Sequence, residues 1–146
     1  MSGVVCAIRG GPASQPTIEK AISLAKEYSL PLYFLYIVNL DFLERTASSR
    51  VHLISKEMHQ MGDFILLSAQ EKAQKEGVVS EGIVRDGNVS EEIVGLCREL
   101  KADYVVLGRP KGEDDEANVF TNERLWILAN LVEGASGAKA VFTNGE

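Results

Sequence analysis

Short apolar runs alternate along this chain with longer segments in which apolar residues recur every three or four positions, and this alternation limits the fold more than any other feature. Apolar runs predict strands at residues 4–8, 31–38, 104–107 and 138–143, and a weaker, partly alternating pattern predicts one at residues 78–84. The periodic segments predict helices at residues 16–28, 54–77, 89–100 and 120–133. Such alternation favours a parallel sheet with helices on both faces and right-handed crossovers. We therefore predict an α/β fold, a doubly wound open parallel sheet, as a single domain over residues 1–146.

Length and composition agree with one independently folding domain. The chain has 146 residues, of which 45% are hydrophobic and 25% charged, and these values are close to the averages of globular proteins. Disordered and fibrous polypeptides have different compositions, so both classes are excluded.

The charge balance argues against nucleic acid as a partner. Lys and Arg together number 15 and Asp and Glu 21, which gives a net charge of −6, whereas affinity for phosphate backbones comes mainly from basic side chains. The first residues lack a basic segment followed by a long apolar one, and no stretch reaches the roughly 18 apolar residues of a membrane helix. We expect a cytoplasmic protein with neither a nucleic-acid nor a membrane partner.

The two cysteines indicate the same compartment. Cys6 and Cys97 are each flanked by apolar residues, which predicts buried thiols in a reducing environment. A disulfide between them is the alternative.

Ligands of doubly wound sheets bind at the carboxyl ends of the strands, where the strand order reverses. This rule selects residues 9–11, 86–88 and 108–112, which follow three predicted strands. Asn88 with Glu91 three residues later resembles a capping box that starts the third helix. Gly87 just before it has two explanations: a tight turn that needs a flexible backbone, and a ligand contact.

Residues 102–109, with the sequence ADYVVLGR, complete a pattern that resembles the universal stress protein family. The strand-loop-helix opening and the Gly87 turn before a helix containing Ile93 fit the same family, and the similarity spans nearly the whole chain. The resemblance implies an adenine-nucleotide alpha-hydrolase-like fold with five parallel strands in the order 3-2-1-4-5. It also implies a homodimer through the last strand, Lys139–Thr143, and, in one branch of the family, binding of ATP.

The candidate nucleotide- or anion-binding residues lie at the predicted strand ends or directly after them. Gly108 matches the first glycine of the family's phosphate-binding segment. The complete set is Arg9, Gly10, Gly11, Ile37, Gly87, Leu107, Gly108, Arg109, Lys111 and Gly112.

Several positions depart from the ATP-binding branch. That branch has an aspartate after the first strand that helps to hold the nucleoside, whereas this chain has Arg9, a donor in place of an acceptor. Lys111 stands at the second glycine position, unless an insertion brings Gly112 there, and no Gly-Ser or Gly-Thr pair occurs in residues 117–124. Residues 113–116 add four carboxylates. Because a hydrogen bond to a charged group contributes about 1.5–3 kcal/mol, we expect ATP binding to be weakened or lost, and no cofactor rather than ATP with Mg²⁺.

A different anion site is the second interpretation of the same cations. Arg9, Arg109 and Lys111 follow strands that the family order places side by side, and the amides of Gly10 and Gly11 could turn toward an anion at the next helix. Alternatively, the cations pair with the acidic segment or extend into solvent.

Other chemistries find little support in the sequence. His52 and His59 are separated by seven residues, roughly 10 Å along a helix, which is too far to share one metal ion. A nucleophile elbow and a dinucleotide-binding glycine motif are both missing from the sequence. The spacing of apolar residues in the fourth helix predicts that Trp126, Leu128 and Val132 form its packed face. The alternative is that part of this apolar surface contacts a second chain.

The sequence therefore predicts a universal-stress-protein-like regulatory domain, homodimeric and without catalytic residues or a metal, that acts by binding a ligand or a protein partner. The alternative is a nucleotide-binding switch or slow ATPase that uses the Gly108–Gly112 loop.

Overall fold

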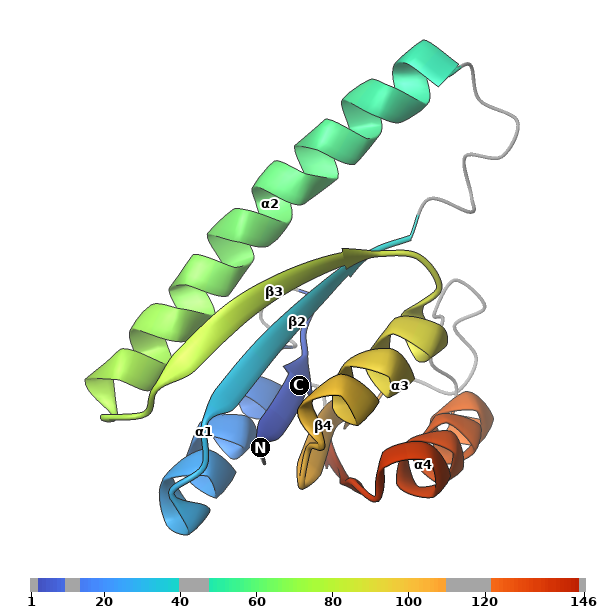
Figure 1. The fold of residues 1–146 in the computed structure, drawn as a ribbon. Helices are drawn as coiled ribbons and strands as arrows, with labels where there is room; N and C mark the ends of the chain where they lie inside the picture. The colour runs from blue at the N-terminus through green and yellow to red at the C-terminus, as the bar shows by residue number, and fades with distance from the viewer. Residues whose placement is uncertain (1–2, 10–13, 40–47, 110–121, 145–146) are drawn as a thin grey trace.

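The computed structural model describes residues 3–9, 14–39, 48–109 and 122–144. Along them five strands alternate with four helices. Figure 1 shows how the elements are arranged. The strands are β1 (Val4–Ala7), β2 (Leu32–Val38), β3 (Ser80–Asp86), β4 (Tyr104–Arg109) and β5 (Lys139–Asn144). The helices are α1 (Gln15–Tyr28), α2 (Ser48–Lys75), α3 (Val89–Leu100) and α4 (Asn122–Ser136).

The strands form one parallel sheet in the order β3-β2-β1-β4-β5. Val5 in β1 lies opposite Tyr33 of β2 and Val105 of β4. The order reverses between β1 and β4, which is where ligands of such sheets bind. The predicted fold class and strand order are confirmed.

Each face of the sheet has its own hydrophobic cluster, because successive side chains of a strand point to opposite faces. On one face α1 and α2 pack against a cluster that includes Cys6 and Phe34. On the other face α3 and α4 pack against a cluster that includes Val5 and Leu35. Figure 1 shows this three-layer arrangement. Strands covered on both sides are apolar at every position, which explains the unbroken runs of the sequence.

The ends of two helices have identifiable causes. At the start of α3 the Glu91 N–H donates to Asn88 Oδ1 at 3.1 Å, the cap that the sequence predicts. Pro16 lies in the first turn of α1, where a missing N–H breaks no intrahelical hydrogen bond. The same helix ends at Ser29, which has a φ of 53° in the left-handed region.

Helix α2 begins at Ser48, earlier than the predicted residue 54, and has 28 residues. Figure 1 shows its first turns extending past the ends of the strands. Turns that cover no sheet need no apolar stripe, and Leu53 is 59% exposed, so periodicity did not reveal them. None of the described helices, α2 included, is long and apolar enough to cross a bilayer.

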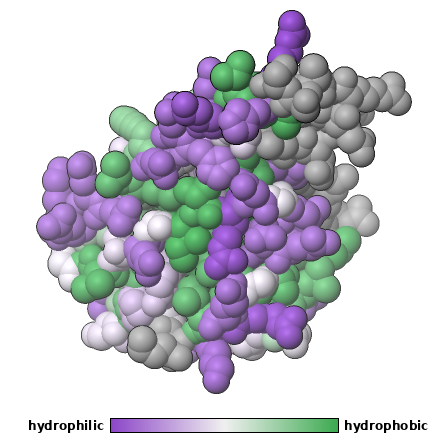
Figure 2. Space-filling model, turned by 45° about the horizontal axis from the view of Figure 1, so that its top comes forward, coloured by the Kyte–Doolittle hydropathy of each residue, from purple (hydrophilic) through white to green (hydrophobic). Residues whose placement is uncertain are grey.

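Some apolar residues lie on the surface rather than in the core. Leu128 and Val132 of α4 are buried as predicted, but Trp126 is 68% exposed, which corrects its placement on the packed face. A change of two positions along a helix turns a side chain by roughly 200°, so Trp126 and Leu128 cannot share one face. Figure 2 shows hydrophobic side chains reaching the surface among polar ones.

The two thiols are free and buried, as predicted. Cys6 belongs to the cluster under α1 and α2, and Cys97 to the cluster under α3 and α4. The sheet lies between them, so the alternative of a disulfide is excluded. Burial raises the pKa of Cys97 to about 12 and raises that of Cys6 further.

Candidate functional site

The carboxyl ends of β1 and β4 lie side by side, as the predicted site requires. Cys6 pairs with Val106 and Ala7 with Leu35, and Ile8 N–H donates to Leu35 O at 2.9 Å. Arg9 follows directly and is exposed. The strand register, continued to this residue, places Arg9 at the level of Ile37 on β2 and of Arg109 on β4. Three of the predicted site residues therefore share one edge.

The remaining candidates differ in what they offer a ligand. Ile37 is half-buried and packs against the cluster under α3 and α4. Leu107 is 2% exposed and lies in that cluster, so only its backbone could face a ligand. Outside the described residues lie Gly10, Gly11, Lys111, Gly112 and the side chain of Arg109.

Gly108 lies where the first turn of α1 meets the sheet. A Cβ atom at this position would lie 2.8 Å from Thr17 Oγ1 and 3.9 Å from Thr143 Oγ1. The two hydroxyl oxygens are themselves 2.8 Å apart, and Thr17 is 3% exposed. Packing alone therefore requires a glycine at position 108.

Sequence reasoning missed Thr17 and Thr143, although both lie at the predicted edge. Thr17 lies in a helix that is predicted from its apolar positions, and Thr143 is the last residue of a short predicted strand. The only available signal was their polarity at positions facing the sheet. The contact between the two residues cannot be inferred from the sequence unless the strand order is known.

Gly87 has a structural reason as well. Its φ is 141°, a region that side chains rarely adopt. Its N–H donates to Val38 O at 3.0 Å, and a Cβ there would lie 3.0 Å from Glu92 Oε2. The turn from β3 into α3 thus needs glycine whether or not a ligand binds.

Charged pairs involve the last two residues of β3, one pair on each face of the sheet. His59 Nε2 on α2 lies 2.7 Å from Asp86 Oδ1 at the end of β3. Arg85 Nη1 lies 3.1 Å from Glu99 Oε2 of α3. His52 is exposed, whereas His59 pairs with Asp86. Within the described parts of the chain, no three His, Cys, Asp or Glu side chains form a group that could hold a metal ion.

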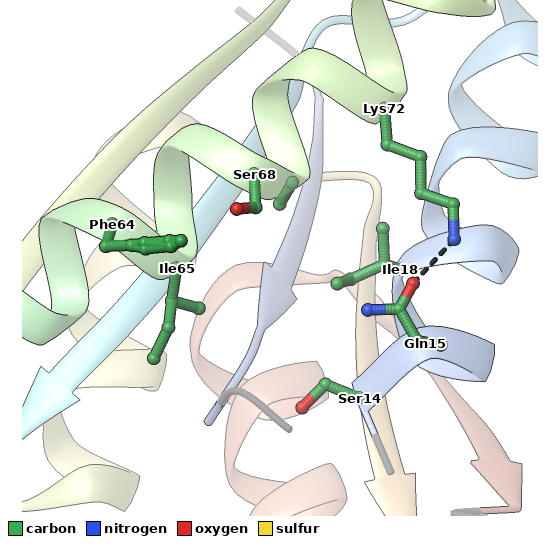
Figure 3. A pocket seen from close by; sticks show the side chains of 8 residues that line it. Ser14, Gln15, Ile18, Phe64, Ile65, Ser68 and Lys72 are labelled. Atoms are coloured by element: carbon green, nitrogen blue, oxygen red, sulfur yellow. Dashed lines mark hydrogen bonds between the residues drawn. The ribbon is translucent and has the colours of Figure 1, made fainter. Parts of the chain in front are cut away.

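A pocket of about 250 Å³ opens between α1 and α2, next to the start of α1. Figure 3 shows its walls: side chains from the first turns of α1 face a stretch of α2. Sequence reasoning did not find it, because helical periodicity does not show which side chains leave a gap between two helices. Its lining residues are Ser14, Gln15, Ile18, Phe64, Ile65, Ser68, Ala69 and Lys72.

The described part of this edge presents the exposed cation Arg9. An exposed guanidinium at Arg9 provides donors for an anion. Both thiols have raised pKa values and are buried, so they are protonated and inert at neutral pH.

Sequence comparison places this architecture among known proteins. Residues 1–117 match the Universal stress protein family. A universal stress protein of Methanocaldococcus jannaschii is 28% identical over 106 residues, which are 72% of this chain and 62% of that protein. The matched region thus spans less than two thirds of that relative's length.

Solved structures of the same family share the fold. A universal stress protein of Archaeoglobus fulgidus in complex with dAMP has a TM-score of 0.60 and 17% identity, with 97% of both chains covered. A universal stress protein family protein of Arabidopsis thaliana with AMP bound has a TM-score of 0.60 and 12% identity, covering 100% of this chain and 93% of that one. At these identities the likeness shows the fold alone.

Proposed function

The chain belongs to the universal stress protein family, and from this premise we propose that it is a regulatory domain that acts by binding, with an affinity for ATP weaker than that of the family's ATP-binding branch. The A. fulgidus and A. thaliana structures hold dAMP and AMP. An adenine nucleotide is therefore the ligand class to test first, at the edge formed by β1 and β4. The two free, buried thiols support the cytoplasm as its compartment.

The position of Arg9 carries this proposal. An aspartate after the first strand can accept hydrogen bonds from nucleoside hydroxyls, whereas a guanidinium only donates. Arg9 is exposed and follows β1. Its positive charge favours contact with a phosphate, but it cannot replace the aspartate carboxylate that accepts hydrogen bonds from the nucleoside. Arg9 is therefore our reason to expect ATP to be held less tightly than in the ATP-binding branch.

The glycines give no independent support for a nucleotide site. Gly87 and Gly108 are both required by the backbone and by packing. Their presence is thus compatible with a chain that no longer binds ATP. The four carboxylates at residues 113–116 add negative charge to the sequence that follows β4, which disfavours a triphosphate most.

Calorimetric titration with AMP and with ATP and Mg²⁺ tests the proposal, with Arg9→Asp as the key variant. We expect wild-type affinity for ATP to be weak, and Arg9→Asp to tighten it about tenfold or more, because one restored hydrogen bond to a charged group contributes about 1.5–3 kcal/mol. Arg98→Asp makes the same charge change on the exposed surface of α3 and should leave the affinity unchanged.

Two results would contradict the proposal. One is ATP bound by the wild-type protein at micromolar or lower dissociation constant, or an adenine nucleotide retained through purification. The other is a loss of affinity in Arg9→Asp. Either result favours the nucleotide-binding switch, in which the Gly108–Gly112 loop holds phosphates despite its substitutions.

We also propose that two copies pair through β5. This strand is the edge of the sheet, and no strand among the described residues lies on its outer side. Exposed edges of this kind are usually paired or covered. The helix before β5, α4, exposes Trp126, Ile127 and Leu131 by 52 to 68%, and such apolar side chains are of the kind that a second copy would cover.

A further inference from the structure

The pocket between α1 and α2 has an apolar bottom that both helices supply. Ile18 of α1 and Ala69 of α2 are 4% and 2% exposed, and Ile65 is half-buried beside them. Phe64 lines the pocket from the side and is 61% exposed. An aromatic ring that is exposed next to an apolar hollow is a stacking surface for another ring.

The polar residues of the pocket come from both helices and carry one charge. Lys72 is the single ionisable residue among the eight that line the pocket. Its Nζ donates to Gln15 Oε1 at 2.5 Å. In Figure 3 the Gln15 nitrogen points away from Lys72 toward the middle of the pocket. The pocket therefore presents an ammonium group and an amide N–H, which both donate.

An anionic group can displace the carboxylate that now lies near Lys72. Glu19 Oε1 is 3.4 Å from Lys72 Nζ, and the Glu19 side chain is 65% exposed. Exposed ion pairs of this kind contribute little to stability, because solvent screens them. A ligand carboxylate inside the pocket can also accept from Gln15, so it makes more hydrogen bonds with Lys72 and Gln15 than Glu19 does.

From this geometry we propose that the pocket binds a small aromatic carboxylate, with its ring against Phe64 and its carboxylate at Lys72 and Gln15. A volume of about 250 Å³ lies below the roughly 300–1,000 Å³ of drug-sized sites, so the ligand has one ring or two fused rings. The site uses none of the residues of the nucleotide edge, and the proposal does not depend on nucleotide binding.

The test is an NMR titration of the ¹⁵N-labelled full chain with 1-naphthoate, compared with the neutral analogue 1-naphthalenemethanol. For a ligand of this size, naphthoate should bind with a dissociation constant of about 1 mM. We expect saturable shifts that centre on the amides of Ile65, Ser68 and Lys72. The neutral analogue should bind more weakly at the same place.

Variants separate the roles of the charge and of the hollow. Lys72→Met should weaken naphthoate binding about tenfold and leave the neutral analogue unaffected, since only the carboxylate uses the ammonium group. Lys75→Met removes the same charge one turn along α2, outside the pocket, and should change neither affinity. Ser68→Phe, at an exposed position of the lining, should fill the hollow and abolish binding of both compounds.

The proposal is overturned by shifts that spread over the surface without saturating, or by equal naphthoate affinity in wild type and Lys72→Met. Because each variant changes an exposed or half-buried side chain, its spectrum should keep the wild-type dispersion. As a second readout, naphthoate binding to the Ser68→Phe variant is followed by fluorescence. Binding to that variant at wild-type affinity also overturns the proposal.

Discussion

Thr17 Oγ1 lies 2.8 Å from Thr143 Oγ1, and this hydrogen bond joins two residues that are 126 positions apart. Thr17 belongs to the first turn of α1, and Thr143 to the edge strand β5. The pair passes over Gly108, which leaves the space for it. The start of α1 is thus fixed to the carboxyl edge of the sheet, where the nucleotide site is proposed.

Gly108→Ala should destabilise the protein by about 1–3 kcal/mol, the usual cost of adding a methyl group to a filled site. The new Cβ would lie 2.8 Å from Thr17 Oγ1, so Thr17 must move and its hydrogen bond to Thr143 must lengthen. Urea unfolding measures the change. Gly95→Ala is the matched control, because a Cβ there meets nothing within 4 Å, and in a helix it should stabilise by about 0.5–1 kcal/mol. Equal stability of the two variants would contradict the proposed role of Gly108.

Asn88→Ala should lower the free energy of unfolding by about 1 kcal/mol, because α3 loses its side-chain cap. The Asn88 carboxamide accepts from the Glu91 N–H at 3.1 Å, and alanine has no acceptor. Asn88→Ser keeps an acceptor at this position and should stay close to wild type. Thermal or urea unfolding of the three proteins checks the order, and an Asn88→Ser variant as unstable as Asn88→Ala would show that the cap is not what matters.

Stability should fall with rising pH above about pH 9, because both thiols keep their protons in the fold and lose them in the unfolded chain. Burial raises the pKa of Cys97 to about 12, whereas an unfolded thiol titrates near 8.5. Because the pKa of the thiol is higher in the folded protein, its contribution to stability is complete at pH values below the unfolded pKa. This contribution is lost as the pH rises from the unfolded pKa toward the folded pKa. The expected loss is about 1.4 kcal/mol per thiol and pH unit.

The urea midpoint measured between pH 8 and 10.5 tests this dependence. Cys97→Ala lowers stability at every pH by removing buried atoms, but its stability should decline less steeply, since one thiol fewer titrates. Parallel curves for wild type and Cys97→Ala would place the pH dependence in other groups.

The sequence predicts the fold well because its strongest signals are local. Buried strands such as β2 are apolar at every residue, and the cap at Asn88 needs only residues three positions apart. Family resemblance supplied the strand order, which local patterns do not contain. The early start of α2 escaped prediction because its first turns cover nothing and carry no periodicity.

The candidate site was predicted less completely, because its determinants are contacts between distant segments. Strand ends indicated the edge formed by β1 and β4 and led to Arg9 and Gly108, whose role in binding stays a prediction. The contact between Thr17 and Thr143 depends on β5 lying beside β4, and the pocket between α1 and α2 depends on how closely two helices approach. Hydrophobic spacing also placed Trp126 in the core, although its position on the helix turns it outward.

Ala140→Pro should prevent the proposed pairing of two copies through β5 while leaving the sheet intact. The Lys139 N–H donates to Asp103 O at 2.9 Å, on the β4 side. In a parallel ladder the backbone groups of successive residues point to alternate sides, so the Ala140 N–H points to the outer side, where a second β5 would accept it. Proline removes this donor, and prolines are tolerated at edge strands in such outward positions.

Light scattering and sedimentation at several concentrations measure the effect. We expect the wild-type protein to be a dimer at high concentration and the Ala140→Pro variant to be a monomer, because a lost donor and a ring at the interface both oppose pairing. Wild-type protein diluted until it dissociates is the matched control, and its thermal unfolding should resemble that of the variant. A wild type that stays monomeric at high concentration, or a variant that dimerises equally well, would show that β5 is not the interface.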